Sequence, residues 1–156
     1  MATFEVQASE GWLDTGVTLV ADHTKGVSIR AAGTWVQDPG WGPVEADGSK
    51  PNDSRYYPHI GVEGKKEWPY HGSGAKAGQL IGKWGEDGPP FAINKHNPIS
   101  GESRADTTRT LRLMINDRSF EMDTNSGALT VTIALYDREN PNGPSQRWDR
   151  IAQRWV

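Results

Sequence analysis

The apolar residues of this chain recur at every second position, and this periodicity constrains its fold more than any other feature. Successive side chains of a β-strand point to opposite faces, so a period-two row indicates a strand with one face in a core. The clearest rows are Leu111, Leu113 and Ile115, and then Leu129, Val131, Ile133 and Leu135. The 18 glycines and 10 prolines separate such segments, and helical spacing is scarce. The sequence therefore predicts an all-β sandwich.

Weaker period-two rows predict the remaining strands. These rows fall at residues 4–8, 17–19 and 27–31, and two short segments, 79–84 and 91–93, are expected to be strands as well. Between the last of them and the Leu111 row lies a polar segment, residues 94–106, which we expect to be a link without a strand.

The length of 156 residues suits one domain with one well-buried core. We expect that domain to comprise residues 1–137, with residues 138–156 as a C-terminal extension packed on it. In the extension, Trp148, Ile151, Ala152 and Trp155 follow helical spacing. A short helix that closes one end of the sandwich is the prediction for this segment.

Charge and composition exclude several partners. The formal net charge of −3 indicates no basic face for nucleic acid, and the absence of cysteine removes disulfides and thiolate catalysis. The start of the chain has neither the basic nor the apolar region of a signal peptide, and no stretch is apolar enough to span a membrane. We expect a protein that is cytoplasmic or released without a signal peptide.

Acidic and amide side chains crowd into the turn between the two clearest rows. The oxygen donors there are Asp117, Asp123, Thr124 and Asn125. Calcium takes six to eight oxygen ligands, so we expect a calcium site at the end of a hairpin formed by the two flanking strands. Ordinary turn formation is the alternative, since Asp, Asn, Ser and Gly are common turn residues. An EF-hand is excluded because a loop starting at Asp123 lacks the glycine and the glutamate of that motif.

Residues 44–77 form the most irregular stretch, and they follow directly on Trp41-Gly42-Pro43. Long loops in compact domains are usually functional or disordered. The density of aromatic and histidine side chains favours an ordered, functional loop. For each of these side chains, simple packing is the alternative.

Catalytic motifs are largely missing. The chain has no Gly-x-Ser-x-Gly elbow, and the glycines at 78 and 82 stand too close together for a phosphate loop. Its four histidines show none of the short spacings of zinc enzymes. We expect a protein that is not an enzyme. A glycosidase stays open as an alternative, because 20 acidic residues leave a catalytic pair unidentified.

The order of four short blocks points to a family. The blocks are Trp12 with Thr15-Gly16-Val17, Ile29-Arg30-Ala31-Ala32-Gly33, Trp41-Gly42-Pro43, and Asn116-Asp117 followed by Asn125-Ser126-Gly127. In this order, over residues 4–135, the chain resembles the galactophilic bacterial lectins of the LecA (PA-IL) type. The resemblance implies a jelly-roll-like, galactose-binding-like β-sandwich with one calcium ion at a loop end. The vicinal hydroxyls of a sugar would complete the metal coordination, and no bond would be made or broken.

The resemblance also implies the calcium ligands, all of which are oxygen donors. They are the carboxylate of Asp117, the backbone carbonyl of Glu121, the side chains of Thr124 and Asn125, and a carbonyl from Gln37 or Asp38. The family has Asn or Asp where this chain has Thr124, so Asp123 is an alternative ligand.

The family's sugar-contacting motif, His-Pro-x-Gln, is matched less completely in this chain. The corresponding segment is Lys50-Pro51-Asn52-Asp53, which keeps only the proline. The sugar-binding candidates are Lys50, Asp53, Tyr56, Tyr57, His59, Trp68, Tyr70, His71 and Arg118. Aromatic rings with polar edges suit a sugar. We expect a calcium-dependent lectin for a galactose-type glycan or monosaccharide, with avidity from a homo-oligomer. The alternative is a structural or protein-interaction module that calcium stabilises.

Overall fold

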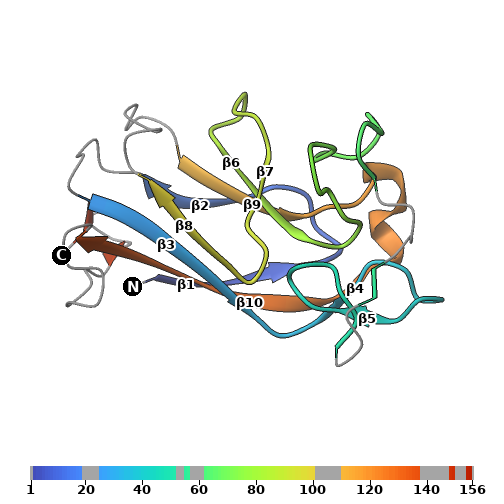
Figure 1. Ribbon diagram of the computed structural model, residues 1–156. Coiled ribbons are helices and arrows are strands. Elements are labelled where there is room, and N and C mark those ends of the chain that lie inside the picture. The colour runs from blue at the N-terminus through green and yellow to red at the C-terminus, as the bar shows by residue number, and fades with distance from the viewer. Residues whose placement is uncertain are drawn as a thin grey trace.

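A computed structural model describes residues 2–18, 25–51, 55–56, 62–100, 110–137, 148–149 and 154–155 of the chain. It is an all-β structure in which two antiparallel sheets face each other (Figure 1). The predicted β-sandwich is confirmed. No helix among these residues is long and apolar enough to cross a membrane.

The larger sheet is built around one long strand, β10 (Ser126–Asp137). Its order is β5-β4-β10-β3-β8, and β1 also pairs with β10. The other strands are β1 (Ala2–Gln7), β3 (Lys25–Ala32), β4 (Trp35–Val36), β5 (Pro43–Val44) and β8 (His96–Ser100).

The smaller sheet has the order β2-β9-β6-β7. Its strands are β2 (Leu13–Thr18), β6 (Leu80–Trp84), β7 (Phe91–Ala92) and β9 (Thr110–Ile115). A separate two-stranded ribbon pairs β11 (Trp148–Asp149) with β12 (Arg154–Trp155).

The two period-two rows of the sequence form opposite walls of one core. The β9 residues Leu111, Leu113 and Ile115 are fully buried, as are Leu129, Val131 and Ile133 of β10. Burying one such side chain stabilises the fold by about 1.5–3 kcal/mol. One core cluster includes residues from Ala2 to Leu135, so both sheets share it.

The turn between β9 and β10 is not the end of a hairpin, and that prediction is wrong. Strand β9 pairs with β2 and β6, whereas β10 pairs with β1, β3 and β4. The chain crosses from one sheet to the other through the 3₁₀ helix η2 (Ser119–Thr124). A period-two row shows that one face of a strand is buried, but it does not show which sheet of the sandwich the strand joins.

Two further predictions are corrected. The segment over 94–106 was expected to hold no strand, but β8 pairs with β3 from Gly26↔Ser100 to Arg30↔His96. The C-terminal helix is also wrong for the residues described, because Trp148 and Trp155 are partners across the β11–β12 ribbon. Their spacing of seven suits a helical face, but it also suits a tight antiparallel pair.

The loops that matter for function gather at the end of the sandwich away from both termini. Figure 1 shows η2, the β4–β5 turn and the loop that precedes β6 on the right, with the N and C ends on the left. Gly127 leads the chain from η2 into β10 with a φ of +82°, and a Cβ there would lie 3.2 Å from the Cα of Trp35. Only glycine accommodates both conditions without strain.

Candidate functional site

The candidate site lies at the crossover from β9 to β10, where three chain segments meet. Asp117 follows β9, Asn125 follows η2, and Gln37 follows β4. Their side chains are hydrogen-bonded to one another, and all three are less than 8% exposed. Residues 80 and 88 positions apart in the sequence therefore form one polar cluster at the sandwich end.

Asp117 is the centre of this cluster and is fully buried. Its Oδ1 accepts hydrogen bonds from the backbone N–H of Arg118 at 2.8 Å and from Gln37 Nε2 at 3.4 Å. Its Oδ2 accepts one from Asn125 Nδ2 at 2.9 Å. A buried carboxylate is costly unless hydrogen bonds or a cation compensate it, so this environment is built around a negative charge.

The orientation of the Asn125 carboxamide is determined by its two acceptors. Its Nδ2 donates to the carbonyl of Ala8 and to Asp117 Oδ2, both at 2.9 Å. Neither acceptor can donate, so the amide cannot be flipped. The opposite atom, Asn125 Oδ1, is the one buried side-chain oxygen without a hydrogen-bond donor within the described part of the chain.

An unpaired buried oxygen beside a buried carboxylate fits a hard cation. Leaving such an acceptor unsatisfied costs about 1–3 kcal/mol, which a bound cation would recover. Calcium prefers carboxylate, carboxamide and carbonyl oxygens, and Asp117 and Asn125 supply the first two kinds. Across the described ranges, no group of three or more His, Cys, Asp or Glu side chains forms a metal cluster. The candidate site thus centres on one carboxylate, and few charges imply weak calcium binding.

Of the two candidate backbone carbonyls, that of Asp38 is less available to a cation than that of Gln37. The carbonyl oxygen of Asp38 already accepts the backbone N–H groups of Trp41 at 3.0 Å and Gly42 at 2.9 Å. A carbonyl has two lone-pair sites, and this turn uses both of them. One oxygen of the Asp38 carboxylate, Oδ1, also accepts the N–H of Gly40 at 2.8 Å. The carbonyl of Gln37 is therefore the better candidate.

The structure places the other predicted ligands on η2, between Asp117 and Asn125. Asp123 and Thr124 have exposed side chains, whereas the cluster around Asp117 is buried. Glu121 lies in the same helix, so its backbone is described but its side chain is not. The cluster observed here therefore unites Gln37, Asp117 and Asn125.

Loop 62–77, which precedes β6, packs as a small unit of its own. Its buried cluster comprises Val62, Trp68, Ala75 and Ala77, with Tyr70 packed against it. Trp68 is only 5% exposed, and the guanidinium Cζ of Arg118 lies 5.2 Å from its ring centroid. Trp68 therefore contributes to loop packing rather than an open surface for a sugar. His71 is exposed beside it, with Nδ1 2.9 Å from the Trp68 carbonyl.

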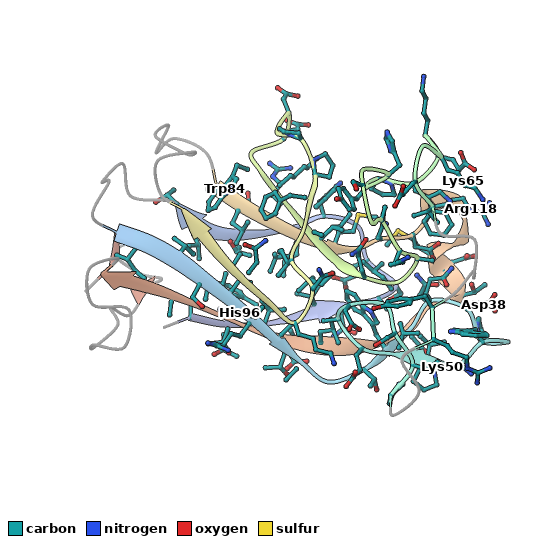
Figure 2. All side chains as sticks on the ribbon, viewed as in Figure 1. Asp38, Lys50, Lys65, Trp84, His96 and Arg118 are labelled. Atoms are coloured by element: carbon teal, nitrogen blue, oxygen red, sulfur yellow. The ribbon has the colours of Figure 1, made fainter. Side chains whose placement is uncertain are left out.

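Cations also lie over the rings of Trp41 and Tyr56 at this end. Lys50 Nζ lies 4.2 Å from the centroid of Trp41, with Arg55 Cζ at 5.5 Å, and Lys76 Nζ lies 4.9 Å from the ring of Tyr56. Such contacts hold a positive charge in place at a surface. Figure 2 shows Asp38, Lys50, Lys65 and Arg118 at this end, whereas Trp84 and His96 lie along the body of the sandwich. Three further sugar-binding candidates, Asp53, Tyr57 and His59, lie outside the described residues.

Sequence reasoning missed two groups that build the site. The carbonyl of Ala8 fixes the Asn125 amide, and no sequence pattern marks a backbone oxygen for such a role. Asn116 is fully buried and bonds to loop 62–77 through three side-chain hydrogen bonds. The sequence does contain a signal for the role of Asn116, because a carboxamide directly after an apolar row must find buried hydrogen-bond partners.

No family model matches the chain, and no curated protein matches its sequence. Among solved structures, the chain is similar to one described as "EclA N-terminal domain; PllA-like lectin", with 17% sequence identity and a TM-score of 0.49. The likeness covers 85% of this chain and 94% of that chain. At that identity and score the likeness gives no information about the site, which is defined only by the contacts among the residues of this chain.

Proposed function

We propose that this protein is a calcium-dependent carbohydrate-binding protein that performs no catalysis. The proposal is supported mainly by Asn125 Oδ1, a buried oxygen that no donor of the described residues reaches, beside the buried carboxylate of Asp117. A cation held there lies at a sandwich end surrounded by polar and aromatic loops, which is a suitable place for a small polar ligand.

The residues that would hold calcium are Asp117, Asn125 and the carbonyl of Gln37, with Glu121, Thr124 and Asp123 of η2 as further oxygen donors. Bound calcium exchanges water readily, so it supplies coordination positions that two adjacent sugar hydroxyls can fill. Hydrogen bonds from Gln37, Arg118 and Asn125 keep the carboxylate of Asp117 in position, so this ligand is preorganised.

The choice of sugar would come from side chains around the ion. Lys50 and Arg118 place cations at this end, and His71 is exposed on the neighbouring loop. These groups can donate hydrogen bonds to sugar oxygens that calcium does not contact. Galactose is the specificity that the family resemblance suggests, and a homo-oligomer would raise a weak monovalent affinity through avidity.

Retention on galactose-coupled agarose tests this proposal. We expect the protein to bind in millimolar calcium and to elute with a chelator. Mannose-coupled agarose is the matched control for sugar choice. Passage through both resins in calcium would remove the galactose assignment, and retention that resists the chelator would remove the role of the metal.

A second candidate is a structural module in which calcium only stabilises the crossover. The burial of Trp68 and Asp117 favours it, because neither side chain offers surface to a ligand. In that case calcium raises the melting temperature while no glycan binds. Comparing thermal stabilisation with glycan binding in the same buffers separates the two functions.

A further inference from the structure

The two residues that flank Asp117 both contact loop 62–77. On one side, Asn116 is fully buried, and its Oδ1 accepts the backbone N–H of Tyr70 at 3.0 Å. Its Nδ2 donates to the carbonyls of Tyr70 and Lys76, both at 2.9 Å. On the other side, Arg118 lies over the ring of Trp68. The loop is thus attached to the chain on both sides of the candidate calcium ligand.

Only a carboxamide fits the position of Asn116. Its one oxygen and both N–H groups are used, and every partner is a backbone group of the same loop. Aspartate would keep the acceptor for Tyr70 but lose both donors, and an apolar residue would lose all three bonds. The backbone strengthens the attachment, because Asn116 N–H donates to the Gln79 carbonyl and its carbonyl accepts Gly78 N–H.

Hydrogen bonds between distant residues of loop 62–77 connect the segment around Tyr70 to the rest of the loop. Gly64 N–H donates to the His71 carbonyl at 2.8 Å, and Gly74 N–H donates to Glu63 Oε1 at 2.6 Å. The buried cluster around Trp68 lies between these contacts. Loop 62–77 is therefore held together by its own contacts as well as by those to Asn116.

We propose that Asn116 is a positioning residue that couples calcium at Asp117 to the placement of loop 62–77. Through this coupling, the ion fixes the exposed His71 and the half-buried Tyr70 relative to the sugar. The inference rests on the proposed function and deepens it, because it makes the ion an organiser of the selectivity loop as well as a sugar ligand. Because Asp117 and Asn116 are adjacent in the chain, the coupling requires no intermediate residues.

The amide hydrogen of Tyr70 reports on this coupling directly, since its acceptor is the Asn116 side chain. We expect saturating calcium to slow the exchange of this amide in the wild-type protein. The amide of Leu129 in the fully buried part of β10 is the internal reference, because it reports global unfolding and calcium should slow it only as far as calcium raises overall stability. Hydrogen exchange followed by NMR resolves both amides.

The variant Asn116→Ala removes the coupling. Calcium affinity should stay within about threefold of wild type, while glycan affinity falls by about 5- to 150-fold, the range of coupled sites. Calcium should no longer slow the Tyr70 amide. Asn97→Ala is the matched control, because Asn97 also donates from a part-buried carboxamide to a backbone carbonyl, that of Ala92 at 2.7 Å.

The outcomes separate this inference from the proposed function. If calcium binds wild type and glycan binding requires it, but Tyr70 exchange is unchanged, the coupling is wrong and the proposed function stands. If calcium does not bind wild type, both fall. Should Asn116→Ala fail to fold, the wild-type exchange measurement alone still decides the matter.

Discussion

The variant Asn125→Asp tests whether a cation binds beside the buried side chain of Asn125. It replaces Nδ2, which donates to the Ala8 carbonyl and to Asp117 Oδ2, with an oxygen that cannot donate when ionised. Without calcium, three acceptors then face one another in a buried site. With calcium, the same change adds a second carboxylate to the ligand set. One substitution should therefore weaken the protein in chelator and strengthen its response to calcium.

The magnitude follows from the two hydrogen bonds that are lost. Each buried acceptor left unsatisfied costs about 1–3 kcal/mol, so the variant should be about 2–6 kcal/mol less stable in chelator. For a chain of this size 1 kcal/mol corresponds to about 2–4 °C, which gives a melting temperature lower by about 4–24 °C. For wild type, a site with one carboxylate and a Kd on the order of 10⁻⁴–10⁻³ M gains about 1.4–2.7 kcal/mol at about 10 mM calcium. That gain corresponds to about 3–11 °C, and the variant should gain more.

Differential scanning fluorimetry in chelator and in calcium measures all four melting temperatures. Asn97→Asp is the control, because it removes a comparable donor from the Ala92 carbonyl, which lies outside the polar cluster. Its loss of stability should be the same in both buffers. Equal losses for Asn125→Asp in chelator and in calcium would refute the placement of a cation at Asn125.

Three further results are expected. Asp117→Ala should fold but show neither calcium-dependent stabilisation nor glycan binding, and a folded variant that still binds glycan would exclude a metal bridge. His71→Ala should change the glycan profile on an array while the calcium-induced shift in melting temperature stays as in wild type; an unchanged profile would place selectivity elsewhere. Burial, and then the positive charge of Arg30, lower the pKa of His96 below its ordinary value, so protonation favours the unfolded chain. Stability should therefore fall as the pH drops through about 6.5, and His96→Gln should flatten that fall; identical pH profiles of the melting temperature would contradict the assignment.

Local side-chain alternation explains why the core strands could be predicted from the sequence. The rows in β9 and β10 are fully buried because period two places each row on one face, whatever the strand pairs with. Pairing itself is not local, so the sequence could not show that β9 and β10 belong to different sheets. Strand β8 was missed because its sequence is polar and contains Pro98. Such a strand is tolerated at an edge, which is where β8 lies in the sheet order.

The candidate site was only partly predictable for the same reason. Asp117 and Asn125 were predicted from their chemistry and from the family resemblance, and the structure brings them within hydrogen-bond distance. The burial of Trp68 depends on how loop 62–77 folds back on itself, which no spacing in the sequence encodes. The role of Asn116 depends likewise on backbone groups 40 and 46 residues away.

A glycan array probed in millimolar calcium and again in excess chelator measures the class of ligand and its dependence on the metal in one experiment. The fluorescently labelled full chain should bind a defined set of glycans in calcium, with terminal galactose among them, and lose that binding in chelator. Asp117→Ala, shown to be folded by its melting transition, should bind none in either buffer. Calcium-dependent glycan binding is excluded if wild type binds no glycan in calcium, or if it binds the same glycans equally well in chelator.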